Sequence, residues 1–400
     1  MAEAAGIYRL VRGLVKAKAA QATALLGELG IDLWLIFVRE TKMMADPALA
    51  LVVGEEATWQ SCFAFSRNGE AVALVGNLDA ANFERAGQFS EVRTYTHGVG
   101  EDLAGLVRRF DPAQIAVNYS ANDPAADGMT HGMYLLLKEH LRGTPYGERL
   151  VSAERLMSKL RSRKLPEEVA RIATAAQLTA AVWESEAPHV RAGMTEAEVA
   201  GLIDRGIAGA GGEPSFATIV NAGDKSAPGH GLPSGAKLAG GDLLHVDFGI
   251  RREGYCADLQ RLLYFRRPGE KRPPAELREA FAMVRDIITE TAKAARPGAT
   301  GCAVDALARE MLRDHGYPEY QHALGHQLGR DVHDGGGILG PEWERYGVTP
   351  RMELEAGNVF TLELEILLPG IGCVGLEEDA VIREDGAEFL CPRQMELAVR

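Results

Sequence analysis

Two segments of the chain, which begin 105 residues apart, repeat one pattern. The first reads RAGMTEAEVAGLIDRGIAGAGG from Arg191, and the second reads RPGATGCAVDALAREMLRDHGY from Arg296. Each predicts a loop, a threonine N-cap (Thr195 or Thr300) and an amphipathic helix. Each also follows an expected long helix, near 167–187 and 275–295, and precedes expected strands. Six identities in 22 positions could arise by chance in helical sequence, but the shared order of elements favours a duplicated half-domain.

The residues before this duplication predict a separate, smaller α/β domain. A helical pattern covers AKAAQATALLGELGI, and buried strands are expected in DLWLIFV and AQIAVNYS. The dipeptide Asn68-Gly69 lies between two apolar runs and predicts a type I′ hairpin. A basic, polar stretch then leads to Pro166 and two acids, which are typical of a helix start. We therefore expect an α/β (α+β) chain of two domains, residues 1–154 and 155–400.

Composition excludes several classes of protein. The formal net charge is -13, whereas nucleic-acid binding needs clustered Lys and Arg. We find no stretch that resembles a signal peptide or a membrane-spanning helix. The five cysteines are scattered and form no CxxC pair, which predicts reduced, buried thiols. These features predict a cytoplasmic protein that binds neither nucleic acid nor membrane.

The stretch LLHVDFGIRREGYCADLQR, residues 243–261, predicts a hairpin with one aspartate in each strand. A turn at residues 251–254 would place Asp247 directly opposite Asp258 on one face. Like charges so placed destabilise a sheet, and burial increases the penalty. The pattern therefore predicts either a protonated carboxyl or a cation between the two side chains.

A second hairpin with paired acids is expected in NVFTLELEILLPGIGCVGLEEDAVI, residues 358–382. A turn at residues 369–372 would place Glu363 opposite Glu378, with Glu365 on the same face as an alternative ligand and Glu377 pointing away. A β-bulge would break this register. A single strand carboxylate is usually solvated, but four in matched pairs favour a divalent cation.

The segment HALGHQLGRDVHDGG adds three histidines as candidate nitrogen ligands, namely His322, His326 and His333. Spacing by itself selects none of them. Several carboxylates with one imidazole suit Mn²⁺, Co²⁺ or Fe²⁺, with Zn²⁺ as an alternative. A cysteine-rich structural zinc site is excluded.

Taken together, these motifs resemble the pita-bread metallopeptidases, which include methionine aminopeptidase, aminopeptidase P and prolidase. The shared motifs are D-x-G with a second Asp eleven residues on, GH-x-LG with a second His seven on, T-x-E, and E-D before an apolar strand. The resemblance covers residues 155–400 strongly and implies a pseudo-twofold pita-bread catalytic domain. The N-terminal domain resembles more weakly the one that prolidases and aminopeptidases P carry. The implied metal ligands are Asp247, Asp258, His326, Glu363 and Glu378, of which Asp258 and Glu378 would bridge two ions.

The resemblance also implies roles for the residues around the metal. Glu363 is expected to accept and shuttle the proton, so that His230, His333 and Glu363 form the catalytic set. His230 and His333 are expected to hydrogen-bond the scissile oxygen and the substrate backbone. A free substrate carboxylate calls for an arginine, and Arg351 is our candidate, with the alternatives Arg345 and Arg330.

Several positions depart from the family pattern. Gln327, Asp334 and Leu364 stand where the family usually has Gly, Glu and Pro, and Leu376 stands at the place of an expected arginine. Prolidases often have a tyrosine where this chain has Phe216. If that hydroxyl orients an aspartate ligand, the second ion binds weakly here. We therefore expect one or two divalent ions, Mn²⁺ first.

The expected activity is metal-dependent hydrolysis of Xaa-Pro dipeptides, a small-peptide substrate, by a homodimer. The alternative within the family is an Xaa-Pro aminopeptidase acting on longer peptides. Two further alternatives are relatives with a different function: a non-catalytic pita-bread binding protein, and a metal-independent enzyme acting on a small guanidino compound. Both are disfavoured because the chain keeps a candidate for every metal ligand.

Overall fold

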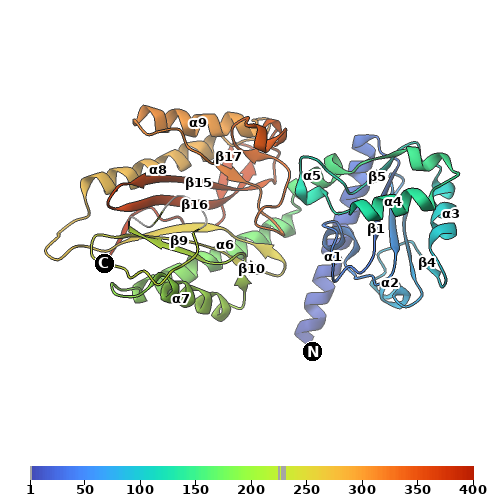
Figure 1. Ribbon diagram of the computed structural model, residues 1–400, viewed down its shortest axis with the longest axis horizontal. Helices are drawn as coiled ribbons and strands as arrows, with labels where there is room; N and C mark the ends of the chain where they lie inside the picture. The colour runs from blue at the N-terminus through green and yellow to red at the C-terminus, as the bar shows by residue number, and fades with distance from the viewer. Residues whose placement is uncertain (1, 224–225, 227–230) are drawn as a thin grey trace. The chain divides into compact units, whose positions relative to one another are not determined.

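The computed structural model describes residues 2–223, 226 and 231–400, apart from the side chains of residues 2–11. The chain forms two compact units, Met1–Arg161 and Ser162–Arg400 (Figure 1). The boundary expected after residue 154 coincides with the start of helix α5 (Glu154–Ser162). Because the first unit ends at Arg161, it contains all of this helix except Ser162.

The first unit is built on a six-stranded mixed sheet in the order β4-β3-β2-β1-β5-β6. Central strand β1 is buried on both faces, because LWLIFV is apolar throughout. Its even-numbered residues pack with Leu25 and Leu26 of α1, and its odd-numbered residues pack with Leu103 and Leu106 of α3. The strands are β1 (Leu33–Val38), β2 (Ser61–Ser66), β3 (Ala71–Gly76), β4 (Glu91–Tyr95), β5 (Ile115–Val117) and β6 (Leu150–Ser152). The helices are α1 (Ala2–Leu29), α2 (Ala80–Ala86), α3 (Gly100–Phe110) and α4 (His131–His140).

The hairpin expected at Asn68-Gly69 forms, but the predicted type I′ turn is wrong. The Ser66 N–H donates to the Glu70 carbonyl, so the loop has three residues, 67–69, and Asn68 lacks the positive φ that a type I′ turn requires. Strands β2 and β3 pair antiparallel, with Phe65 opposite Ala71. Gly69 has a φ of 90°, a backbone conformation that glycine adopts without steric penalty.

The second unit has the duplicated order of elements that the repeat predicts. Helices α7 (Glu196–Gly209) and α9 (Gly301–Asp314) each have 14 residues, and their bounds differ by the 105 residues of the repeat. Thr195 caps α7 and exchanges hydrogen bonds with Glu198 in a capping box, while Thr300 is the N-cap of α9 without a side-chain bond. The preceding long helices are α6 (Pro166–Glu186) and α8 (Ala275–Ala294).

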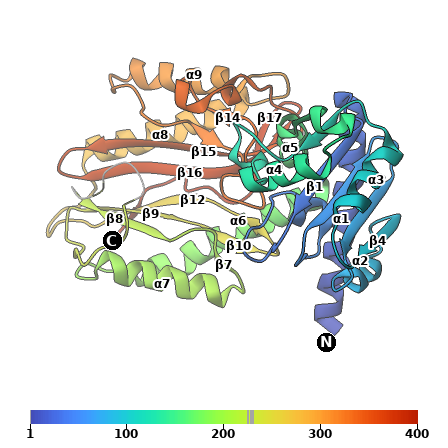
Figure 2. The ribbon, with the colours of Figure 1, turned by 45° about the vertical axis from the view of Figure 1, so that its right-hand side comes forward.

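A seven-stranded sheet forms the centre of this unit, with β15-β16-β12-β9-β8 in order, β17 beside β16 and β18 beside β12. Helix α8 contacts β15 and β16, whereas α6 contacts β12 and α7 contacts β8 (Figure 2). The strands of this sheet are β8 (Ile219–Ala222), β9 (Leu243–Phe248), β12 (Leu259–Tyr264), β15 (Val359–Leu368), β16 (Gly372–Arg383), β17 (Gly386–Phe389) and β18 (Ala398–Val399). Shorter strands are β7 (Glu213–Pro214), β10 (Ile250–Arg252), β11 (Tyr255–Cys256), β13 (Gly325–His326) and β14 (Ile338–Leu339).

The first acidic hairpin has a different register from the one expected. Arg252 pairs with Tyr255, so the turn contains only Glu253 and Gly254. Their φ values of 51° and 79° fit the type I′ turn that a two-residue hairpin loop favours. Asp247 is therefore opposite Gln260, and the predicted pairing with Asp258 is wrong. Because the shift is two residues, the side chains keep their expected face.

The second acidic hairpin is shifted by a single residue. Leu368 pairs with Gly372, which leaves a three-residue loop in which Gly370 has a φ of 78°. Such loops commonly carry a left-handed residue. Glu363 is consequently opposite Glu377, and the predicted pairing with Glu378 is wrong. A one-residue slip exchanges the two faces of a strand, so Glu377 and Glu378 swap places relative to the prediction.

Candidate metal centre

Four side chains form a row across the central sheet of the second unit. Asp247 of β9 pairs with Gln260 of β12, Gln260 pairs with Glu377 of β16, and Glu377 pairs with Glu363 of β15. Residues directly opposite in neighbouring strands share a face, with Cβ atoms about 4.5–5.5 Å apart. We call these four residues the acid row. Three carboxylates thus lie on one face with a single amide among them.

Asp258 joins the acid row from the segment just before β12. It lies two residues before Gln260, and its backbone N–H donates to Asp379 Oδ2 at 3.1 Å. The Asp258 side chain is 7% exposed. This aspartate therefore adds a fourth carboxylate to the same place.

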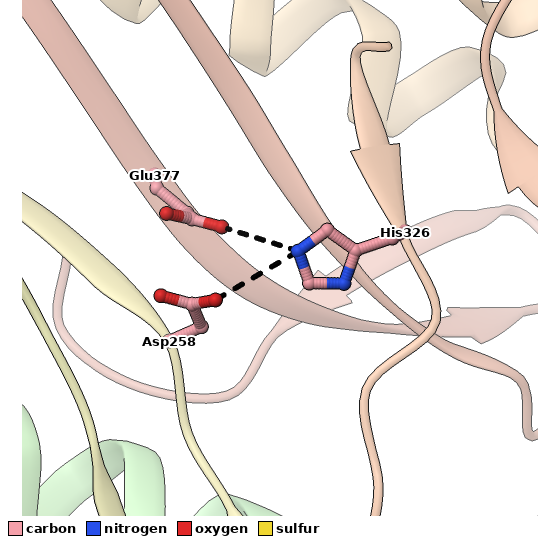
Figure 3. Close-up of side chains that lie close together, drawn as sticks. All are labelled: Asp258, His326 and Glu377. Atoms are coloured by element: carbon pink, nitrogen blue, oxygen red, sulfur yellow. Dashed lines mark ion pairs between the residues drawn. The ribbon is translucent and has the colours of Figure 1, made fainter. Parts of the chain in front are cut away.

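His326 is brought to these carboxylates by the short strand β13. Its backbone N–H donates to Thr361 Oγ1 at 3.2 Å, and the N–H of Glu363 donates to the Leu324 carbonyl at 2.7 Å, which ties the segment to β15. The His326 Nε2 atom lies 3.7 Å from Asp258 Oδ2 and 4.0 Å from Glu377 Oε1 (Figure 3). It also lies 4.0 Å from Glu363 Oε1.

These distances are too long for hydrogen bonds but suit a shared cation. One ligand atom each from Asp258, His326 and Glu377 lies within 4.8 Å of the other two. Oxygen and nitrogen ligands at about 2.0–2.2 Å from one ion would have this separation. The Nδ1 atom of His326 is 3.3 Å from the Gln327 carbonyl. Donation from Nδ1–H to that carbonyl leaves the lone pair of Nε2 directed at the carboxylates.

The electrostatics of the cluster call for a positive charge. Burial raises the pKa of Asp258, and the negative charges of Asp247, Asp379 and Glu363 raise it further. Burial and the charges of Asp258 and Glu363 likewise raise the pKa of Glu377. The pKa of Glu363 is raised to about 8 by burial, Glu365 and Asp247.

Unsatisfied carboxylate oxygens in the cluster also favour a cation. Asp258 Oδ1 and Glu377 Oε1 are buried and have no hydrogen-bond partner among the residues that the structure describes. Leaving buried acceptors unsatisfied is costly, and a divalent ion would satisfy them. Oxygen ligands with one imidazole fit Mn²⁺, Co²⁺ or Fe²⁺, so the residues present fit the expected metal.

Glu378 does not belong to this cluster. Its Oε2 atom accepts a hydrogen bond from Arg261 Nη2 at 3.0 Å, and its Oε1 atom lies 3.8 Å from Arg393 Nε. The side chains of Glu378 and Arg261 are only 1% and 2% exposed. Because of the one-residue shift in register, Glu377 and not Glu378 lies beside His326 and Asp258. A buried arginine in β12 needs a carboxylate partner, and that requirement could have identified Glu378 from the sequence.

His333 lies beside His326, at the solvent side. The rings of His326 and His333 have centroids 4.3 Å apart at an interplanar angle of 81°, and His333 is exposed. The next residue, Asp334, forms a 2.7 Å ion pair with Lys164, with side chains 3% and 1% exposed. Asp334 Oδ1 also accepts from the backbone N–H of Arg330 at 3.1 Å. Asp334, which stands where the family usually has glutamate, therefore holds the loop that carries His333 through these buried contacts.

The other predicted site residues either lie away from the cluster or are not among the residues that the structure describes. His230 lies outside the residues that the structure describes. Arg351 is at the surface with a side chain 67% exposed, and it is ion-paired with Glu342. Its role in substrate binding stays a prediction. Among the described residues, every helix is too short or too polar to cross a bilayer.

The chain is similar to several known proteins. It matches the profile of metallopeptidase family M24 over residues 170–384. An uncharacterized peptidase of Staphylococcus aureus (strain USA300) is 34% identical over 236 residues, which are 58% of this chain and 64% of that protein. An Xaa-Pro dipeptidase of Pyrococcus furiosus is 31% identical over 244 residues, which are 60% of this chain and 66% of that protein. The matched part therefore spans just under two thirds of these relatives.

A solved structure extends the likeness to nearly the whole chain. An X-Pro aminopeptidase from Thermotoga maritima matches with a TM-score of 0.74 at 26% identity. The match covers 96% of this chain and 99% of that one. Both units of the fold are therefore found together in a known peptidase structure.

Proposed function

This chain belongs to metallopeptidase family M24, and from that premise we propose that it hydrolyses Xaa-Pro dipeptides with one or two divalent ions. The observation that carries the proposal is the convergence of Asp258, His326 and Glu377 within 4.8 Å in a buried cluster of acids. The Pyrococcus relative named an Xaa-Pro dipeptidase supports the choice of substrate. Mn²⁺ is the proposed ion, because oxygen ligands with one imidazole suit it.

We assign the metal to Asp258, His326 and Glu377, with Asp247 and Glu363 beside them. When bound, a divalent ion supplies an electrophile for the carbonyl and lowers the pKa of water towards neutrality. Glu363 is suited to take and pass on a proton at Oε1. Its side chain is 22% exposed, and its Oε1 atom lies 4.0 Å from His326 Nε2.

His333 is proposed to orient the substrate. Its exposed ring, 4.3 Å from that of His326, can donate a hydrogen bond to the carbonyl oxygen of the scissile bond as negative charge develops there. A bond to proline has no N–H and a fixed ring, so an enzyme must recognise it specifically. His230 keeps the same proposed role, and Arg351 remains the proposed partner of the dipeptide carboxylate. The homodimer and the cytoplasmic location also remain predictions.

An Xaa-Pro aminopeptidase is the second candidate, favoured by the match to the Thermotoga structure. The two candidates differ in whether proline is the last residue of the substrate or is followed by another residue. Steady-state hydrolysis of Gly-Pro and Gly-Pro-Ala by the Mn²⁺-loaded protein separates them. We expect kcat/KM to be far higher for the dipeptide, and equal or faster cleavage of the tripeptide would transfer the assignment to the aminopeptidase.

Two controls complete this experiment. Asp258→Asn, purified in the same way, should be inactive on both peptides, which excludes a contaminating host peptidase. If the wild type binds Mn²⁺ and cleaves neither peptide, the proposed activity is wrong.

A further inference from the structure

Gln260, the amide of the acid row, links the ligand Glu377 to a second buried residue, His245. Gln260 Nε2 lies 3.0 Å from Glu377 Oε2, and Gln260 Oε1 lies 3.0 Å from His245 Nε2. Gln260, Glu377 and His245 are 2%, 2% and 4% exposed. The three side chains therefore form a continuous polar chain in the interior, behind the metal ligands.

Hydrogen-bonding chemistry fixes the direction of this chain. A carboxylate oxygen only accepts, so the amide nitrogen of Gln260 must be the atom that faces Glu377. The amide oxygen then faces His245 and accepts from Nε2–H, which places a proton on that nitrogen. Donation to Glu377 Oε2 fixes the rotation of the carboxylate about its last bond. Glu377 Oε1 is left towards His326, without a hydrogen-bond partner among the described residues.

The chain also depends on the absence of a side chain at Gly375. This residue lies two positions before Glu377 in β16, on the same face. A Cβ atom there would lie 2.7 Å from both Gln260 Oε1 and His245 Nε2, and 3.0 Å from Glu365 Cγ. Gly375 has no left-handed backbone conformation that would require glycine. The small size of Gly375 therefore leaves room for the Gln260–His245 pair.

We infer that His245, Gln260 and Gly375 are positioning residues that hold Glu377 in its metal-binding orientation. Outer partners of this kind orient ligands, and their loss commonly weakens metal binding 10–100-fold. The inference rests on the metal centre of the proposed function. It goes beyond that function in assigning part of the metal affinity to three residues that bind neither ion nor substrate.

The test is the dissociation constant of Mn²⁺, measured by titration calorimetry on metal-free protein. Gln260→Leu removes the amide and leaves Glu377 Oε2 without its donor, so we expect binding roughly 10–100-fold weaker than in the wild type. Gly375→Ala keeps every hydrogen-bonding group but crowds the pair, and should weaken Mn²⁺ binding in the same direction. The double variant should be no weaker than the weaker single variant, since both changes act on one device.

A matched control separates positioning from general loss of stability. Thr291→Val removes a buried hydroxyl whose bonds, among the described residues, go to carbonyls of its own helix, α8. Its Mn²⁺ affinity should equal that of the wild type even if its melting temperature falls. If Gln260→Leu does not fold, as judged by circular dichroism, the affinity of Gly375→Ala decides the question.

The outcomes distinguish this inference from the proposed function. Wild-type affinity in folded Gln260→Leu, or in Gly375→Ala when Gln260→Leu does not fold, would overturn the positioning role, whatever the activity of the wild type. If the losses of Mn²⁺ affinity add in the double variant, Gln260 and Gly375 do not act through the same hydrogen-bonded pair. A wild type that binds no Mn²⁺ would overturn the metal centre itself, and this inference with it.

Discussion

Two adjacent glutamates, Glu377 and Glu378, should respond in opposite ways to the same substitution by glutamine. Glu377 faces His326 and Asp258, whereas Glu378 lies on the other face of β16 and binds Arg261. Glu377→Gln should therefore remove metal binding and leave the fold intact. Glu378→Gln should leave metal binding intact and destabilise the fold.

The size of the second effect follows from burial. Removing one partner of a buried ion pair costs about 3–5 kcal/mol, because the other charge stays in the interior. Arg261 is 2% exposed and keeps carbonyl acceptors at Gln260, Glu377 and Pro392. The amide oxygen of the new glutamine can also accept, so we expect the low end, about 3 kcal/mol. For a unit of this size each kcal/mol lowers the melting temperature by roughly 2–4 °C, a total of roughly 6–12 °C.

Glu377→Gln should change the stability of the metal-free protein for a different reason. In the metal-free protein Glu377 is one of several buried carboxylates, and opposed like charges destabilise a sheet. Neutralising one of them relieves repulsion, so the metal-free variant should melt at or above the wild-type temperature.

Thermal melts of the wild type and both variants, in chelator and in excess Mn²⁺, read out both effects. A ligand stabilises only a state that binds it. Glu378→Gln should melt roughly 6–12 °C lower in chelator yet gain as much from Mn²⁺ as the wild type. Glu377→Gln should gain little from Mn²⁺. The reasoning is refuted if Glu378→Gln melts like the wild type in chelator and loses the gain from Mn²⁺.

Three further outcomes are expected. Dialysis against a chelator should abolish peptide hydrolysis and Mn²⁺ or Co²⁺ should restore it; full activity in protein shown by elemental analysis to be metal-free would contradict this. Asp258→Asn should lower kcat/KM by orders of magnitude while its metal-free form melts no lower than the wild type; a clear drop in that melting temperature would count against the crowded carboxylates. Lys164→Met leaves Asp334 buried without its cation, and urea unfolding should show a loss of about 3–5 kcal/mol; a loss below about 1 kcal/mol would show that the pair contributes little.

The helical part of the catalytic unit could be predicted closely from the sequence. The threonine caps and the apolar period are local signals, and they fix the starts of α7 and α9 within the repeat. The position of the Asn68-Gly69 hairpin was equally accessible, although its loop has three residues instead of the two that a type I′ turn would have. Each of these features is decided by residues within one or two helical turns of one another.

The register of the acidic hairpins could not be read in the same way. Glu253 adopts a positive φ of 51°, which is uncommon for a residue other than glycine. A two-residue turn at Glu253-Gly254 was therefore not expected from the sequence. The sequence Pro-Gly-Ile-Gly admits a three-residue or a four-residue loop, and the choice reverses the faces of Glu377 and Glu378. Burial and pairing across strands, which the sequence does not display, decide between them.

Gln260 and His245 went unnoticed for the same reason. In sequence they are single polar residues in apolar strands, and such residues are usually explained by local hydrogen bonds. Only the pairing of β12 with both β9 and β16 reveals that Gln260 stands between Asp247 and Glu377. The spacing of the histidines did not select one of them as a ligand either. The position of His326 on strand β13 is what brings its side chain to face the carboxylates.

The most direct test of the metal centre is anomalous diffraction at the manganese edge from crystals soaked in Mn²⁺. We predict an anomalous peak bonded to Asp258, His326 and Glu377, with Glu378 still bound to Arg261 on the opposite face. A peak at Glu378, or no peak near His326 at saturating Mn²⁺, would contradict the account.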